Sequence, residues 1–225
     1  RNDLGSQWLI VSGIGSINVT AATVFLHQFS NASSSSFWFN VGMAGYYSGS
    51  LGELFLIDKI TDDVTGKKHF PRPVFEKKVK KAELLTVSNP RRNLMGGRLI
   101  DMEGYSFFDI VSRFALREMM AIIKVVSDTQ ERDNSNITAK LANELILNGL
   151  PVIRSLVLEA EKLSKHEYER THSSDSVNEV VSRNYFTEAN RKIAEKLITD
   201  WENAFPSRSL IEEIRNLETA YEIIE

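Results

Sequence analysis

The sequence predicts an α/β protein of three layers, in which helices cover both faces of a mostly parallel, mixed central sheet. Two observations support this class and a third adds an extension. Apolar runs of strand length alternate with helical segments over residues 8–128, as in sheets covered on both faces. Hydrophobic residues make up 42% of the chain, enough for a full core. Residues 137–225 are helical in period, which predicts a C-terminal helical extension.

The elements are expected in a simple order. Glycine-bounded or β-branched apolar runs predict strands at "QWLIVSGIG", "FWFNVGMAG", "GELFLIDKI", 84–87, "GGRLIDMEG" and "MMAIIKVVSD". Helices are predicted at "SINVTAATVFLHQFS", where Ile17, Ala21, Val24 and Phe25 can share a face, and at "YSFFDIVSRFALRE". Further helical stretches are expected at 137–170, 175–203 and 207–225. The predicted domains are therefore a core of residues 1–136 and a helical extension of residues 137–225.

Composition excludes several classes of function. The net charge of -3 offers no basic field for nucleic acid or an anionic membrane. No run of about 18 uninterrupted apolar residues is present, so we expect no membrane partner. The absence of cysteine removes disulfide and thiolate chemistry and fits a cytoplasmic protein. The four histidines are scattered without metal-ligand spacing, so no metal site is expected. No cofactor is expected either.

Two carboxylates at strand ends are the first candidates for chemistry. Glu103 follows an apolar strand and precedes a glycine, and Asp128 ends another apolar strand. Ligands of open α/β sheets bind beyond the carboxyl ends of strands. There a carboxylate can bind vicinal hydroxyls, or act as an acid when its surroundings desolvate it. From spacing alone, Glu103 and Asp128 are more often caps of the following helices.

The glycines of "VGMAG", residues 41–45, are the second candidate feature. Backbone amides without a neighbouring Cβ can approach a ligand closely. A tight turn after the strand would need the same residues. "SGIGS" lacks the third glycine of a dinucleotide fingerprint.

Four segments together resemble the superfamily of purine nucleoside phosphorylases and methylthioadenosine/adenosylhomocysteine nucleosidases. They are "SGIGSINVTAAT", "FNVGMAGYYSGSLGELFLIDKITD", "LIDMEGYSFFDIVSRFA" and "IIKVVSD", in the family's order between residues 8 and 128. The resemblance implies the nucleoside phosphorylase-like fold and a homo-oligomer. The family's first strand has no counterpart ahead of this region, so we expect that an N-terminal part is missing.

The resemblance also implies a role for each matching position. Asp128 would be the catalytic acid that protonates purine N7 as the glycosidic bond breaks. Glu103, beside Met102, would bind the ribose 2′- and 3′-hydroxyls. The remaining matches are base-binding Ala44, Gly45 and Ser127, and weaker phosphate-binding candidates Lys124, Arg91 and Arg92.

Two hypotheses about function stay open at this point. The first is an enzyme that cleaves the N-glycosidic bond of a purine nucleoside, with water or phosphate as co-substrate. This reading would place the protein among pentosyltransferases or glycosidases of nucleoside metabolism. The alternative is a non-catalytic protein, nucleoside- or nucleotide-binding or structural, that kept the fold and lost the nucleophile site. Met43 stands where the family commonly has Ser or Thr, and a thioether cannot donate a hydrogen bond.

Overall fold

The computed structural model describes residues 7–90, 97–129, 138–171, 175–183, 186–205, 207–208 and 210–214. The chain divides into two compact units, Arg1–Ser164 and Lys165–Glu225. This boundary falls inside helix α3 (Ala139–Thr171), whereas the sequence suggested a boundary ahead of that helix.

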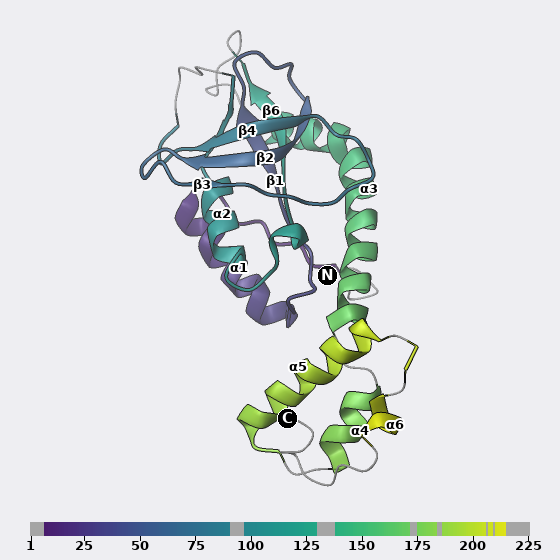
Figure 1. Ribbon diagram of the computed structural model, residues 1–225. Coiled ribbons are helices and arrows are strands. Elements are labelled where there is room, and N and C mark those ends of the chain that lie inside the picture. The colour runs from purple at the N-terminus through teal and green to yellow at the C-terminus, as the bar shows by residue number, and fades with distance from the viewer. Residues whose placement is uncertain are drawn as a thin grey trace. The chain divides into compact units, whose positions relative to one another are not determined.

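The described residues of the first unit form a sheet of six strands, and helices cover this sheet (Figure 1). The strands are β1 (Trp38–Gly45), β2 (Leu54–Asp62), β3 (Lys68–His69), β4 (Lys81–Thr86), β5 (Leu99–Asp101) and β6 (Met120–Asp128). The helices are α1 (Ser16–Ser30), α2 (Gly104–Val111), the 3₁₀ turn η1 (Arg117–Met119) and the first part of α3.

The sheet is mixed and bends back on itself. Its strand order is β3-β2-β4-β5-β1-β6, and β6 also pairs with β2. Parallel ladders join β1 to β6, β2 to β4 and β4 to β5. Antiparallel ladders join β2 to β3, β2 to β6 and β1 to β5. This agrees with the predicted α/β class and its mixed central sheet.

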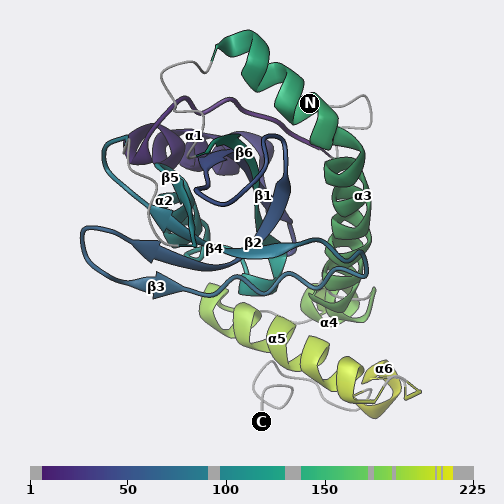
Figure 2. The same cartoon turned by 90° about the horizontal axis from the view of Figure 1, so that it is seen from above.

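Helices cover both faces of this sheet (Figures 1 and 2). Alternate residues of the fully buried strand β6 point to opposite faces. Ile122 and Val126 pack in one cluster with Val19 of α1 and Phe108 of α2. Ala121 and Ile123 pack in another cluster with Ile153 and Leu156 of α3. The three predicted layers are therefore present.

Helix α3 is also long and apolar enough to be considered as a membrane-spanning helix. Its length and composition would allow residues Ala139–Arg170 to cross a membrane, with 22% of the most apolar window buried. Four residues of α3, Leu145, Ile153, Leu156 and Ala160, are buried in the first unit.

Two expectations for the N-terminal region are wrong. In the part of the chain that the structure describes, residues 7–13 form no strand, and Leu9 and Val11 are 86% and 90% exposed. Helix α1 forms as predicted, but it buries Val19 and Thr23. The expected face is turned outward, with Ile17 85% exposed and Phe25 57% exposed.

The second unit has a small core of its own. Its helices are α4 (Asp175–Arg183), α5 (Glu188–Ala204) and α6 (Leu210–Glu213), so the predicted helical stretch 175–203 is in fact two helices. Val177 and Val180 of α4 pack with Ala194 and Ile198 of α5 and with Leu210. Thr187 begins α5 by accepting a hydrogen bond from the amide of Asn190 at 3.3 Å, a usual N-cap arrangement.

Candidate functional site

Strand pairing brings the two motif-bearing segments to either side of β1. Gly45 at the end of β1 pairs with Ile100 of β5 on one side and with Asp128 of β6 on the other. Neighbouring strands lie about 4.8 Å apart, so β5 and β6 are about 10 Å apart at this row. Glu103 follows three residues after Ile100. The segments that carry the two candidate carboxylates are therefore joined through Gly45.

Asp128 lies at an irregularity in the ladder between β1 and β6. Ala44 pairs with Val126 and Gly45 with Asp128, which leaves Ser127 as the extra residue of a β-bulge. Bulges re-aim side chains and are frequent beside active sites. Here the Ser127 hydroxyl donates to Oδ1 of Asp128 at 2.6 Å, and its oxygen lies 3.4 Å from the carbonyl oxygen of Ala44.

The surroundings of Asp128 are closed to most solvent. Its exposed fraction is 7%, and those of Ser127 and Ala44 are 3% each. The amide of Tyr46 donates to the carbonyl oxygen of Asp128 at 2.9 Å, which holds the backbone on both sides of the bulge. The side chain of Asp128 therefore has a fixed hydroxyl partner and a fixed backbone.

Glu103 occupies the N-cap position of α2 without acting as its cap. Among the described residues, its carboxylate accepts no hydrogen bond from the amides of the first helical turn. Its Oε1 instead accepts from the amide of Gly15 at 2.6 Å, and Oε2 accepts from the amide of Met102 at 3.3 Å. Gly15 is the N-cap of α1, with φ of 96°, so the carboxylate lies at the positive end of that helix.

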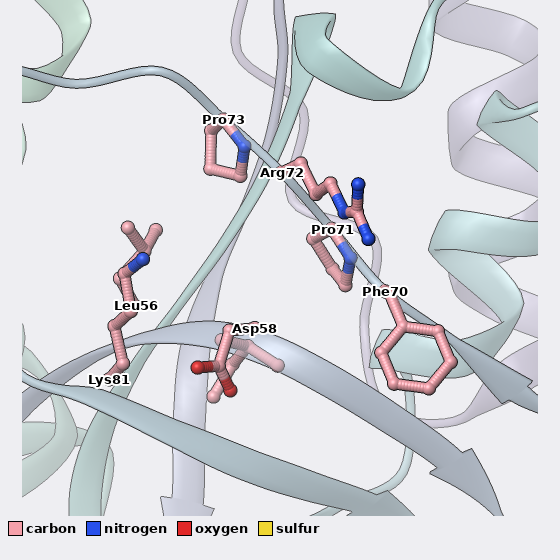
Figure 3. A pocket seen from close by; sticks show the side chains of 8 residues that line it. Leu56, Asp58, Phe70, Pro71, Arg72, Pro73 and Lys81 are labelled. Carbon is pink, nitrogen blue, oxygen red and sulfur yellow. The ribbon is translucent and has the colours of Figure 1, made fainter.

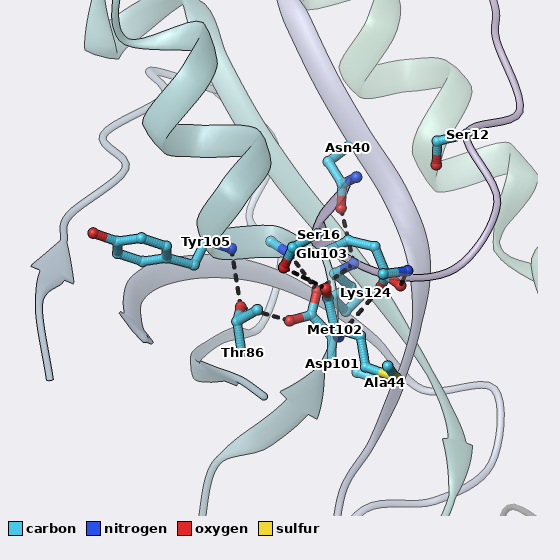
Figure 4. A network of polar contacts seen from close by, with 12 residues as sticks. Ser12, Ser16, Asn40, Ala44, Thr86, Asp101, Met102, Glu103, Tyr105 and Lys124 are labelled. Carbon is cyan, nitrogen blue, oxygen red and sulfur yellow. Dashed lines mark hydrogen bonds and ion pairs between the residues drawn. The ribbon is translucent and has the colours of Figure 1, made fainter. Parts of the chain in front are cut away.

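Two other side chains provide the cap that α2 requires (Figure 4). Asp101 Oδ2 accepts from the amide of Gly104 at 2.8 Å, and Thr86 Oγ1 accepts from the amide of Tyr105 at 2.9 Å. The Thr86 hydroxyl donates in turn to Asp101 Oδ1 at 2.7 Å. Capping is therefore the work of Asp101 and Thr86, which argues against the interpretation of Glu103 as only a helix cap.

Lys124 is the buried counter-charge of Asp101. Its Nζ lies 2.8 Å from Asp101 Oδ2 and donates to Asn40 Oδ1 at 2.8 Å. The side chains of Lys124 and Asp101 are 1% and 0% exposed. An ammonium group that is engaged in this way gives no support to the suggested phosphate-binding role of Lys124.

The same ammonium group explains one of the glycines of "VGMAG". A Cβ at Gly42 would lie 3.2 Å from Lys124 Nζ, because the lysine side chain extends from β6 past β1 toward β5. Gly42 thus makes room for an internal side chain. Ala44 and Gly45, which were predicted to bind the base, are buried at the end of β1.

Of the remaining residues predicted for the site, the structure describes Met102 but not the two arginines. Met102 is half-buried against Leu85, Val87 and Ile100, and its carbonyl oxygen accepts from the Ser16 hydroxyl at 3.2 Å. Arg91 and Arg92 lie outside the described residues. No cluster of three or more metal-ligating side chains occurs within the described ranges.

Sequence reasoning missed Asp101 and Thr86, although one signal pointed to them. Lys124 interrupts the apolar strand "MMAIIKVVSD", and a buried lysine requires a carboxylate partner. Asp101 belongs to the neighbouring motif "LIDMEG" and directly precedes the Met102–Glu103 pair. The strand assignment of both motifs would have made this pairing a reasonable prediction.

A separate cavity of about 270 Å³ lies elsewhere on the sheet. Figure 3 shows its lining residues, which include Asp58, Arg72 and Lys81. Lys81 begins β4, the end of that strand opposite to Thr86. Neither Glu103 nor Asp128 contributes to this cavity, so it is distinct from the candidate site.

Comparison with known proteins finds solved structures with a similar fold. No family model and no curated protein matches the chain. Among solved structures, it is similar to the 5′-methylthioadenosine/S-adenosylhomocysteine nucleosidase of Neisseria meningitidis in complex with methylthio-immucillin-A. The TM-score is 0.52 with 17% identity over 65% of this chain and 78% of that chain.

A nucleosidase (MTAN) of Chlamydia trachomatis is similar to the same extent. Its TM-score is 0.50 with 22% identity, and the match covers 66% of this chain and 77% of that chain. The structural neighbours are thus nucleosidases of the superfamily that the motifs resemble. The first unit has the nucleosidase fold.

Proposed function

We propose that this protein cleaves the N-glycosidic bond of a purine nucleoside. The observation that carries the proposal is that Asp101, and not Glu103, caps the helix that follows β5. Asp101 caps α2, and the carboxylate of Glu103 turns away from the helix that it precedes. A carboxylate that is not needed by its own helix is available to a ligand. The nucleosidase fold supports the choice of a nucleoside as that ligand.

Glu103 would bind the ribose. An ionised carboxylate accepts hydrogen bonds from two hydroxyl groups at once, as a vicinal diol requires. The present partner of Oε1 is the amide of Gly15, and each carboxylate oxygen can accept a second hydrogen bond. The carboxylate can therefore hold the diol while the loop before α1 keeps it in place.

Asp128 would act as the general acid. A proton delivered to purine N7 lets the base leave with the electron pair of the glycosidic bond, while the ribosyl group becomes cationic. Water or phosphate then adds to that carbon atom, and in the case of water a proton is released to solvent as the C–O bond forms. The Ser127 hydroxyl, which donates to Asp128 Oδ1, would hold the orientation of this carboxyl group. General acid catalysis of this kind contributes about 10²- to 10⁴-fold to rate.

The assembly and setting of the protein belong to the same proposal. The named relatives support a small nucleoside as the partner. Action in the cytoplasm and association into a homo-oligomer are proposed from the resemblance, with no cofactor other than phosphate in the case of a phosphorylase.

The test is turnover of inosine, adenosine and methylthioadenosine, each with and without phosphate. We expect base release by the wild-type protein and a fall in kcat of about 10²-fold or more for Asp128→Asn. Asp58→Asn is the matched control, because Asp58 lines the separate cavity, and it should keep the wild-type rate. No base release by the full-length protein, where a reference nucleosidase works, would end the enzymatic proposal.

Met43 favours a second candidate, a nucleoside-binding protein without turnover. This residue lies on β1 two residues before Gly45, and its thioether cannot donate a hydrogen bond to water or phosphate. This candidate predicts nucleoside binding by calorimetry without base release. Glu103→Ala should weaken adenosine binding by about 10- to 100-fold under either candidate and leave adenine binding nearly unchanged. An equal loss for both ligands would contradict the ribose-binding role.

A further inference from the structure

We propose that Lys124, Asp101 and Thr86 form a buried positioning device that directs the carboxylate of Glu103 toward the loop before α1. The identity of the ligand rests on the proposed function, whereas the contacts that form the device are all within the protein. None of the three side chains would touch substrate. Each would act through the turn that carries Met102 and Glu103.

The device begins with a charge pair that solvent does not reach. Lys124 comes from β6 and Asp101 from β5, on opposite sides of β1. Their charged atoms meet at 2.8 Å, and Asn40 of β1 accepts a further hydrogen bond from the same ammonium group at 2.8 Å. Three strands are thereby tied together directly behind the turn.

The pair then determines how α2 begins. Both oxygens of Asp101 are in use, because Oδ1 accepts from Thr86 and Oδ2 from both Lys124 and Gly104. Thr86 holds the next amide, that of Tyr105. The first two amides of α2 therefore have partners from β4 and β5, and the N-cap carboxylate of Glu103 is not required for either.

The turn before α2 and the neighbouring strand β1 leave little room for a side chain at two glycine positions. A Cβ at Gly104 would lie 3.0 Å from Asp101 Oδ2 and 2.5 Å from a Leu84 methyl group. A Cβ at Gly42 would crowd the Lys124 ammonium group. Two glycines on separate elements thus accommodate the same network, which indicates that the backbone around it is shaped to hold these side chains.

Thr86→Val and Thr86→Ser are the decisive pair of variants. Valine has nearly the shape of threonine but lacks the hydroxyl group, so it leaves the Tyr105 amide and Asp101 Oδ1 without their partner. Serine keeps the hydroxyl group and serves as the matched control. Lys124→Met is a stronger perturbation, and near-ultraviolet circular dichroism shows whether this variant folds. If Lys124→Met does not fold, the two Thr86 variants alone test the proposal.

The first readout needs no ligand. The Gly15 amide donates to Glu103 Oε1 at 2.6 Å, so its exchange rate and proton shift in NMR spectra report where the carboxylate points. We expect at least tenfold faster exchange of the Gly15 amide in Thr86→Val, with near wild-type behaviour in Thr86→Ser. Unchanged Gly15 exchange in folded Thr86→Val would overturn the proposal.

The second readout is the preference for adenosine over 2′,3′-dideoxyadenosine, measured by calorimetry. Thr86→Val should lose most of this preference, about tenfold or more, with adenine binding unchanged, and Thr86→Ser should keep most of it. A wild-type protein with no such preference would refute the ribose role of Glu103 but leave the Gly15 result standing. A wild-type preference that Thr86→Val retains in full would refute the positioning role alone.

Discussion

At the residue scale, Gly104 shows how closely the turn before α2 is packed. It is the first residue of the helix, where alanine would ordinarily be tolerated or preferred. A Cβ here would lie 2.5 Å from Leu84 Cδ2 and 3.0 Å from Asp101 Oδ2. We therefore expect Gly104→Ala to lower the free energy of unfolding by about 1–3 kcal/mol, measured by urea titration.

Gly149 is the matched control for this prediction. It lies within α3, and a Cβ there would meet the terminal methyl of Leu54 at 3.1 Å and that of Ile153 at 3.7 Å. The Leu54 contact is longer than the 2.5 Å contact with Leu84 at Gly104, and Leu54 is only partly buried whereas Leu84 is fully buried. Alanine is also favoured over glycine by about 1 kcal/mol in a helix. Gly149→Ala should be neutral or stabilising, and equal effects of the two substitutions would contradict the packing argument.

At the scale of elements, the short strand β3 is held against α2 by an imidazole. The ring of His69 lies 4.9 Å from the rings of both Tyr105 and Phe108. Its Nε2 is 3.5 Å from Asp109 Oδ1. Burial lowers the pKa of His69, and the opposing effect of Asp109 is smaller.

This lowered pKa makes the stability of the protein depend on pH. The unfolded chain, with a histidine pKa of about 6.5, binds a proton more readily than the folded protein does. The free energy of unfolding is therefore highest above that value and falls as the pH drops through the lowered pKa of the folded state. We expect His69→Phe, which keeps an aromatic ring, to reduce the loss of stability between about pH 7.5 and pH 5.

Urea titrations at several pH values measure this difference. Contributions from other groups cancel to first order when the variant is compared with the wild-type protein. Parallel pH profiles for both proteins would show that His69 is not responsible.

At the scale of the whole molecule, the helices of the second unit have a core separate from the sheet. Ile198 of α5 is 3% exposed in this core, whereas Ile193 of the same helix is 47% exposed. Ile198→Ala should cost about 2–5 kcal/mol, because it leaves a cavity among the helices. Ile193→Ala should cost much less.

Hydrogen exchange followed by mass spectrometry resolves where the loss occurs. Faster exchange is expected within α4 and α5, with β6 of the first unit unchanged. Equal acceleration in β6 would show that the two units unfold together.

Much of the fold was predictable because it depends on local patterns. The strands at "FWFNVGMAG", "GELFLIDKI" and "MMAIIKVVSD" and the long helix after residue 137 are where periodicity placed them. The face of α1 was not predictable, since apolar residues lie all around that helix and only packing with the sheet and α2 buries Val19. Residues 7–13 show the same limit, because strand pairing depends on tertiary contacts that an apolar run does not specify by itself.

The sequence by itself determined the α/β class, the order of the motifs and the two carboxylates that deserve testing, because apolar periodicity and strand-end residues are local properties. Only the tertiary structure decided which carboxylate caps α2, where Lys124 finds its counter-charge and why Gly42 has no side chain. These outcomes depend on atoms brought together from β1, β4, β5 and β6. Such distances arise only when the sheet closes, so spacing along the chain cannot reveal them.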